Sequence, residues 1–110
     1  MTRKVFIPQV PTRFDHATQE RVPSLDLNPA RQYGEFVEMT HYSRPGRTDE
    51  ALAELKMTIR HATADDLILV VGDIVLVAAA ISMMNDMFGR ALVLRWDRDK
   101  KSYDFVEVRL

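Results

Sequence analysis

The sequence of 110 residues has no cysteine, and it contains only four glycines and one tryptophan. Without cysteine the chain has no disulfide framework, no thiolate zinc site and no cysteine nucleophile. Such a chain suits a reducing compartment, so we expect a cytoplasmic protein. Residues 1–8 also lack an apolar stretch of signal-peptide length, which favours the same compartment.

An excess of charge of one sign is also missing. Fifteen lysines and arginines oppose sixteen aspartates and glutamates, which gives a formal charge of -1. Proteins that hold nucleic acid by its phosphates usually carry a clear basic excess, so we do not expect nucleic acid to be the main partner.

Four basic residues nevertheless gather with aromatic residues near the C-terminus, which is a nucleic-acid pattern in outline. These candidate nucleic-acid contacts are Arg95, Arg98, Lys100 and Lys101. A solvated hairpin tip, in which Trp96 packs against Tyr103 across two strands, accounts for the same residues. Weak nucleic-acid binding is therefore a third hypothesis for the function.

No clean hydrophobic run of membrane-spanning length is present. The apolar stretch at residues 67–84 is interrupted by Gly72, Asp73 and Ser82. A carboxylate inside a bilayer costs at least about 2.5 kcal/mol, and a Gly-Asp pair is typical of a junction between a strand and a helix. We therefore expect no membrane segment.

The length and the hydrophobic content of 46% predict one α/β domain over residues 1–110. The expected strands are residues 5–7, 36–39, 67–71, 91–96 and 103–110. Residues 67–71 are apolar without alternation, which is typical of a central strand buried on both faces. Right-handed crossovers then predict a parallel β-α-β-α-β centre and a C-terminal antiparallel hairpin, in two or three layers.

Two main helices connect these strands. One follows a turn at residues 43–46 and begins with Thr48 as its cap; the other runs from residue 74 to about 88, between an Asp73 cap and Gly89. The first strand ends at Pro8, which favours a place at the edge of the sheet.

Residues 11–32 form an irregular segment that is rich in proline and charge. Within it, Asn28 before Pro29 predicts one short helical turn with Asn28 as its cap. Loops of this length often bind partners. The second helix also has too little polar surface for a helix that faces water. The candidate partner surface comes from both regions and contains Arg13, Phe14, Arg21, Met83, Met84, Met87 and Phe88.

The pair Gly72 and Asp73 is the candidate ligand site, because open α/β sheets place ligands beyond the carboxyl ends of their strands. The capping role of Asp73 competes with this interpretation. A metal site is not expected, since Asp65 and Asp66 precede the strand whereas Asp73 follows it. The histidines have no ligand partners at metal spacing. We thus predict no catalytic residue, cofactor or metal.

Several short motifs resemble those of small uncharacterised proteins encoded by tailed bacteriophages. They lie at residues 5–9, 28–34, 71–73 and 94–98, the last of them before Tyr103. The resemblance covers nearly the whole chain and implies no activity or cofactor. It implies action in the cytoplasm of an infected bacterial host.

The leading hypothesis is a non-enzymatic protein interaction module, a phage-encoded accessory or host-directed factor. Its partner would be a host or phage protein, or a second copy in a homodimer. The alternative is an enzyme that handles a small ligand or nucleotide, with its site near Gly72 and Asp73.

Overall fold

The computed structural model describes residues 3–41 and 47–110. Its elements in chain order are β1 (Lys4–Ile7), β2 (Thr12–Asp15), β3 (Glu20–Pro23), η1 (Asn28–Tyr33), β4 (Glu35–Glu38), α1 (Thr48–Ile59), β5 (Leu67–Leu69), α2 (Ile74–Phe88), β6 (Ala91–Asp97) and β7 (Ser102–Val108). The predicted turn at residues 43–46 lies outside the described residues.

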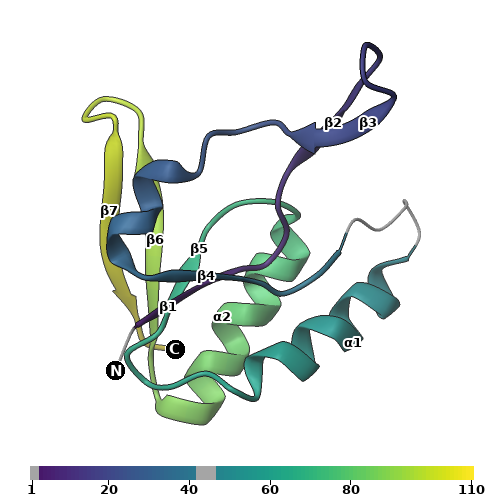
Figure 1. Cartoon of the computed structure of the whole chain (residues 1–110). Helices are drawn as coiled ribbons and strands as arrows, with labels where there is room; N and C mark the ends of the chain where they lie inside the picture. The colour runs from purple at the N-terminus through teal and green to yellow at the C-terminus, as the bar shows by residue number, and fades with distance from the viewer. Residues whose placement is uncertain (1–2, 42–46) are drawn as a thin grey trace.

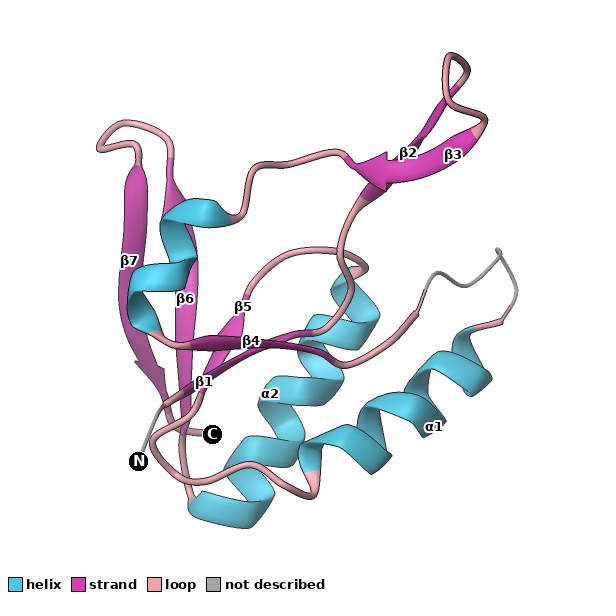
Figure 2. Ribbon diagram, viewed as in Figure 1, coloured by secondary structure: helices cyan, strands magenta, loops and turns pink. Residues whose placement is uncertain are grey.

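The main sheet has five strands in the order β4-β1-β5-β6-β7 (Figures 1 and 2). Its first four strands are parallel to one another, and β7 runs antiparallel to β6. The predicted α/β class, the parallel centre and the C-terminal hairpin are therefore confirmed. The strand β5 lies in the middle, as expected.

The first strand is not at an edge, and that prediction is wrong. β1 lies between β4 and β5, with Val5 opposite both Phe36 and Leu67. Pro8 follows the last residue of β1, so its missing N–H removes no bond from the ladder.

β5 is shorter than predicted because it ends at Leu69 rather than at residue 71. The N–H of Val71 donates to the carbonyl oxygen of Leu69 at 2.9 Å, which turns the chain out of the sheet. The three residues of β5 are fully buried, as the unbroken apolar run predicted.

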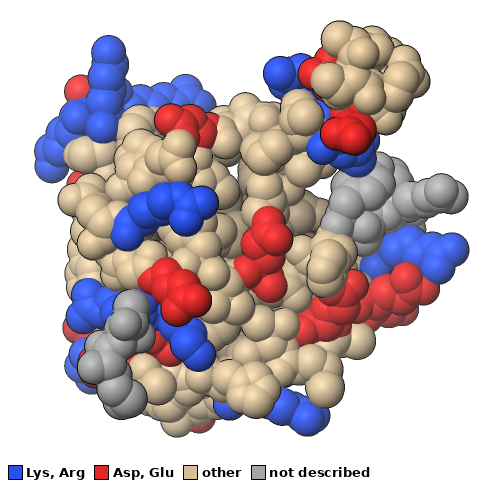
Figure 3. Space-filling view, viewed as in Figure 1, with Lys and Arg blue, Asp and Glu red and all other residues tan. Residues whose placement is uncertain are grey.

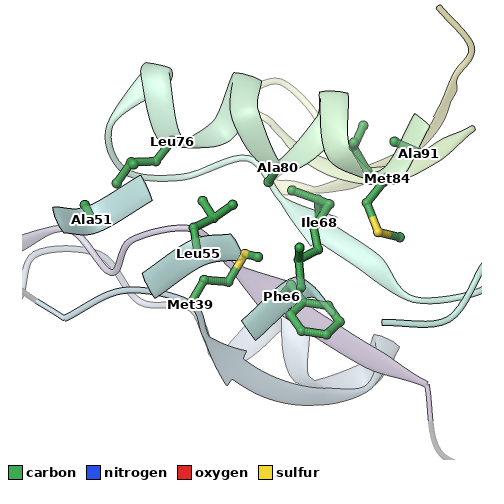
Figure 4. Close-up of a cluster of buried hydrophobic side chains, with 11 residues drawn as sticks. Phe6, Met39, Ala51, Leu55, Ile68, Leu76, Ala80, Met84 and Ala91 are labelled. Atoms are coloured by element: carbon green, nitrogen blue, oxygen red, sulfur yellow. The ribbon is translucent and has the colours of Figure 1, made fainter. Parts of the chain in front are cut away.

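Both helices pack on one face of the sheet. Leu55 of α1 and Ala80 and Met84 of α2 meet Phe6 and Ile68 of the strands (Figure 4). All five are almost inaccessible to solvent. This layer is the larger of the two apolar clusters.

The opposite face is covered in part by η1. Ala30, which is 0% exposed, packs with Val5, Leu67, Leu69 and Leu94. The alternation of side chains along a strand explains the division, because neighbouring residues point to opposite faces. The sheet is thus enclosed by helices on one side and by a single short 3-10 helix on the other.

The predicted capping residues are confirmed at α2 but not at α1 or η1. Asp73 Oδ1 accepts the N–H of Val75 at 2.8 Å, and Gly89 ends the helix at φ 74°. At α1 the cap position belongs to Arg47 and no side chain caps the helix, so the prediction for Thr48 is wrong. The predicted helical turn exists as η1, but Leu27 holds its cap position rather than Asn28.

Residues 11–32 contain a β-hairpin that the sequence did not predict. β2 and β3 pair with each other as a separate two-stranded sheet. Figures 1 and 2 show this hairpin standing away from the body of the molecule. We call β2, β3 and the turn between them, residues 12–23, the arm.

Among residues 3–41 and 47–110, no helix has the length and apolar character needed to cross a membrane.

Candidate partner-binding site

The arm is held together mainly by local hydrogen bonds. Asp15 Oδ1 accepts the N–H of Ala17, and the Gln19 side chain donates to the carbonyl oxygen of His16, which together close the turn. Arg21 donates to the hydroxyl and carbonyl oxygens of Thr12 at 2.9 and 3.1 Å. None of its residues is buried. The arm is therefore an accessible element with its own internal order.

The arm exposes an aromatic side chain flanked by charge. Phe14 is 41% exposed and makes an edge contact with His16, with ring centroids 4.9 Å apart. Phe14 lies opposite Arg21, whereas Arg13 lies opposite Val22 on the other face of the hairpin. The predicted candidates Arg13, Phe14 and Arg21 are thus brought together on one element. Aromatic and arginine side chains are the groups that dominate protein interfaces.

The chain enters and leaves the arm at one place. The N–H of Ser24 donates to the carbonyl oxygen of Pro11 at 2.8 Å, which closes the base of the hairpin. Beyond this base the chain runs past Leu25, 53% exposed, into η1. The arm is thus anchored at one point, between β1 and η1.

A cleft of about 600 Å³ lies between the base of the arm, η1 and β4. Its lining residues are Ile7, Val10, Pro23, Leu25, Asp26, Leu27, Asn28, Arg31, Phe36 and Glu38. The aliphatic and aromatic members provide an apolar surface, and Asp26 and Glu38 add two carboxylates. We call this hollow the acidic cleft.

The cation at the acidic cleft already has partners. Arg31 lies over the ring of Phe36 with its guanidinium carbon 4.4 Å from the centroid, and its Nε donates to Asn28 Oδ1 at 3.0 Å. Asp26 accepts the N–H of Asn28, which uses one of its oxygens. Within the described part of the chain, neither Asp26 nor Glu38 forms an ion pair. The cleft can therefore receive a positive group from outside.

A second hollow of about 460 Å³ lies beside the base of the arm, at the predicted ligand site. Gly72 and Asp73 line it together with Gln9 and Arg21. β1 and β5 are neighbours whose connections leave on opposite faces of the sheet, so this is the topological switch point where α/β proteins often bind ligands.

The polar groups at this switch point are bonded to one another. Gln9 Oε1 accepts the N–H of Asp73 at 2.9 Å, and the Asp73 carboxylate caps α2. Gly72 has φ +91°, and a Cβ there would lie 2.4 Å from the carbonyl oxygen of Gln9. The close approach of two chain segments therefore explains the glycine, and capping explains the aspartate, without a ligand.

The structure divides the predicted partner surface. Met84 is 0% exposed in the core, so its assignment to a partner surface is wrong. Met83 and Phe88 are partly buried against the same core, and Met87 is 42% exposed. These residues are at the C-terminal end of α2, and Figure 1 places that end of the helix far from the arm.

The cations of the β6–β7 hairpin do not share one face. Trp96 and Tyr103 pack edge to face as predicted, with ring centroids 5.0 Å apart. Arg95 is next to Trp96 in β6 and thus points to the opposite face. The Asp104 carboxylate lies 3.9 Å from both Arg95 and Lys100. It therefore offsets the positive charge of two of the four candidate nucleic-acid contacts.

One carboxylate in this hairpin, that of Asp97, stabilises the turn. Asp97 Oδ1 accepts the N–H groups of Asp99 and Lys100 at 2.9 and 3.1 Å. These two backbone bonds, that from Lys100 above all, lower the pKa of Asp97. Asp97 is therefore a structural residue of the tip, as the solvated-hairpin interpretation expected.

The other titratable candidates also have structural contacts. Asp66 is 2% exposed and accepts the N–H groups of Lys4 and Thr63, which fastens the start of β1 to the loop before β5. His41 Nδ1 lies 2.9 Å from Glu54 Oε2. Over residues 3–41 and 47–110, no group of three metal-binding side chains is close enough to hold an ion.

Sequence reasoning missed the acidic cleft. Asp26 is separated along the chain from Phe36 and Glu38, and the three residues line one cleft only in the folded protein. One signal was available, since the expected strand at residues 36–39 contains both Phe36 and Glu38 at the alternate spacing that places side chains on one face.

The comparisons with known proteins give a family. A family model described as Phage Pam3 gp32-like protein matches residues 3–110. No curated protein and no solved structure matches the chain. The resemblance to phage-encoded proteins, which the short motifs suggested, is confirmed by the family match.

Proposed function

Because this chain belongs to the Phage Pam3 gp32-like protein family, we propose that it is a phage-encoded, non-enzymatic protein interaction module acting in the host cytoplasm. The arm is its principal docking element. The observation that carries the proposal is the arm itself, a hairpin that exposes Phe14 opposite Arg21 and whose strands, among the described residues, pair with each other and not with the main sheet.

The energetics of hairpins support a docking role. A two-stranded hairpin alone in water is marginally stable at best, so an arm without a buried residue gains stability when a partner covers it. Phe14 supplies an apolar anchor, and Arg13 supplies a charged group for a surrounding rim. The acidic cleft at the base extends the accessible surface from the arm to β4.

Site-specific photo-crosslinking tests the proposal. A photoreactive residue is introduced in place of Phe14, and the chain is produced in host cells during phage infection. The matched control carries the same residue in place of Met57, which is 58% exposed on α1. We expect discrete crosslinked species from position 14 and much weaker ones from position 57.

A second variant separates docking from folding. Residues 12–23 are replaced by a short Gly-Ser linker, which removes the arm but leaves both apolar clusters intact. We expect a body that unfolds cooperatively and that no longer retains, in an affinity pull-down, the protein that crosslinks to position 14. Equal capture with and without the arm would contradict the proposal.

A ligand-handling function remains the second candidate because of the hollow at the switch point. Asp73→Asn keeps most of the capping ability but removes the carboxylate. Screening nucleotides and small anions by thermal shift, with wild type and this variant side by side, tests the alternative. Ligand binding that Asp73→Asn abolishes would favour it over the interaction module.

A further inference from the structure

The arm has a free edge on each of its two strands. β2 pairs with β3, and among the described residues neither strand pairs with the five-stranded sheet. Free strand edges present unpaired N–H and C=O groups that pair readily with another strand. The arm can therefore add to an exposed strand elsewhere.

β4 offers such a strand. It pairs with β1 on one side and is the last strand of the sheet. The N–H groups of Glu35 and Met39 donate to β1, so the alternate N–H groups, those of Phe36 and Glu38, point toward the open edge. The side chains of Phe36 and Glu38 line the acidic cleft beside this edge. An added strand would thus bring its side chains next to the cleft.

Arg13 of the arm and the two carboxylates of the cleft carry opposite charges. The acidic cleft contains Asp26 and Glu38 without an ion pair among the described residues. Arg13 is exposed on β2, and it too has no ion-pair partner in the described part of the chain. An arginine with an apolar stem fits a cleft that has both aliphatic walls and carboxylates.

The arm cannot enter the cleft of its own chain. Pro23 at the base of the arm already forms part of the cleft wall. From that base the hairpin extends away from the body (Figures 1 and 3), and Figure 1 places its tip far from β4. The cleft of a second copy has no such restriction.

We propose that the partner of the arm is a second copy of this chain: the arm of one copy adds to the open edge of β4 in the next, and Arg13 enters the acidic cleft between Asp26 and Glu38. This rests on the proposed function as an interaction module. Each contact joins the arm of one copy to the cleft of another, so reciprocal exchange between two copies closes a two-fold dimer, whereas one-way contacts generate a ring or a filament.

Charge reversal with light scattering tests this pairing. The variants are Arg13→Glu and Glu38→Arg, and the control is Arg98→Glu, an exposed cation at the tip of the β6–β7 hairpin. We expect the wild type and the control to assemble with the same concentration dependence. Each reversal at the interface places like charges together, so assembly should weaken at least about tenfold.

Mixing the two variants supplies the decisive measurement. In an equimolar mixture the glutamate introduced in one arm meets the arginine introduced in the other cleft. The native Arg13 of the second variant likewise meets the native Glu38 of the first, so every contact between unlike chains regains opposite charges. We expect assembly to return in the mixture although neither variant assembles alone. Circular dichroism should show the same fold for all variants, because both positions are exposed.

Three outcomes would overturn the inference: a wild type that stays monomeric at all concentrations, an Arg13→Glu variant that assembles like the wild type, or a mixture that does not recover. A monomeric wild type whose position 14 still crosslinks to another protein would leave the interaction module standing. Absence of both assembly and crosslinking would remove the module as well.

Discussion

The body and the arm of this protein are ordered by different forces. In the body, Val5, Leu55 and Leu67 are 0% exposed and belong to clusters that join residues far apart in the chain. In the arm no residue is buried, and the most widely separated pair of residues in its two strands is Thr12 opposite Pro23. Burial therefore stabilises the body, whereas the arm remains available for binding.

The largest expected contrast comes from removing one apolar side chain in each region. Leu55→Ala should lower the free energy of unfolding by about 2 to 5 kcal/mol, because it leaves a cavity between α1 and the sheet. Phe14→Ala should change it by less than about 0.5 kcal/mol, because Phe14 is 41% exposed. Urea denaturation of both variants measures the difference. Similar losses would show that the arm packs on the body.

The junction between the regions should be sensitive to backbone geometry. Gly72→Ala forces a Cβ to within 2.4 Å of the carbonyl oxygen of Gln9 and places alanine at φ +91°. We expect a loss of about 1 to 3 kcal/mol. Gly89→Ala is the control, because it has φ +74° but no atom within 4 Å of the added Cβ.

If thermal or urea unfolding shows equal losses for the two glycine variants, the cost comes from the backbone conformation alone. A larger loss at Gly72 would locate the cost in the contact with Gln9, the residue that leads from β1 toward the arm.

A smaller effect is expected at the cap of α2. Asp73→Ala should lower stability by about 1 kcal/mol, because the N–H of Val75 loses its acceptor. Asp73→Asn should lower it by only a few tenths of a kcal/mol, since an asparagine side chain also accepts a hydrogen bond. Thermal unfolding in a single buffer distinguishes the two. Equal losses would indicate that the charge of Asp73 matters more than its bond.

The smallest effect concerns pH at the end of β4. The hydrogen bond to Glu54 raises the pKa of His41, and the same bond lowers the pKa of Glu54. The contribution of His41 is fully present below its ordinary pKa of 6.5 and is lost as pH rises through the raised value. That of Glu54 is present above its ordinary 4.5 and is lost as pH falls through the lowered value.

The pair therefore stabilises the protein most between pH 4.5 and 6.5. Unfolding midpoints of the wild type and Glu54→Gln should differ most in this window and converge on either side. Both groups are exposed to solvent, so the difference should be small and should shrink further in high salt. A difference in unfolding midpoint that stays constant across the pH range would show that the ion pair is not its cause.

The sequence predicts the body better than the arm, and the reason is physical. The apolar run at residues 67–71 and the Asp73 cap are local signals, and both predicted real elements, although β5 ends early. The arm has only Phe14 and Val22 as apolar residues in its strands apart from the proline at its base, too few for an alternating pattern. The hydrogen bonds of Asp15 and Gln19 order the turn of the arm, but they produce no periodic pattern of apolar residues in the sequence.

The candidate site was predicted only in part. The length and irregular composition of residues 11–32 predict a partner surface in that segment. The structure places its candidate residues Arg13, Phe14 and Arg21 on one hairpin. The acidic cleft depends on how residues 25–31 lie beside β1 and β4, which is a tertiary relation that no short motif encodes. Met84 was wrongly predicted to lie on the surface, because an apolar helix face does not show whether a partner or the rest of the chain covers it.

The position of β1 has a consequence for how the protein is made. Residues 4–7 leave the ribosome before their two neighbours in the sheet, which are residues 35–38 and 67–69. Asp66, which binds the N–H of Lys4, is 62 positions away. The first strand therefore lacks its neighbour β5 until residues 67–69 have been synthesised, whereas the two strands of the arm follow β1 directly and pair with each other.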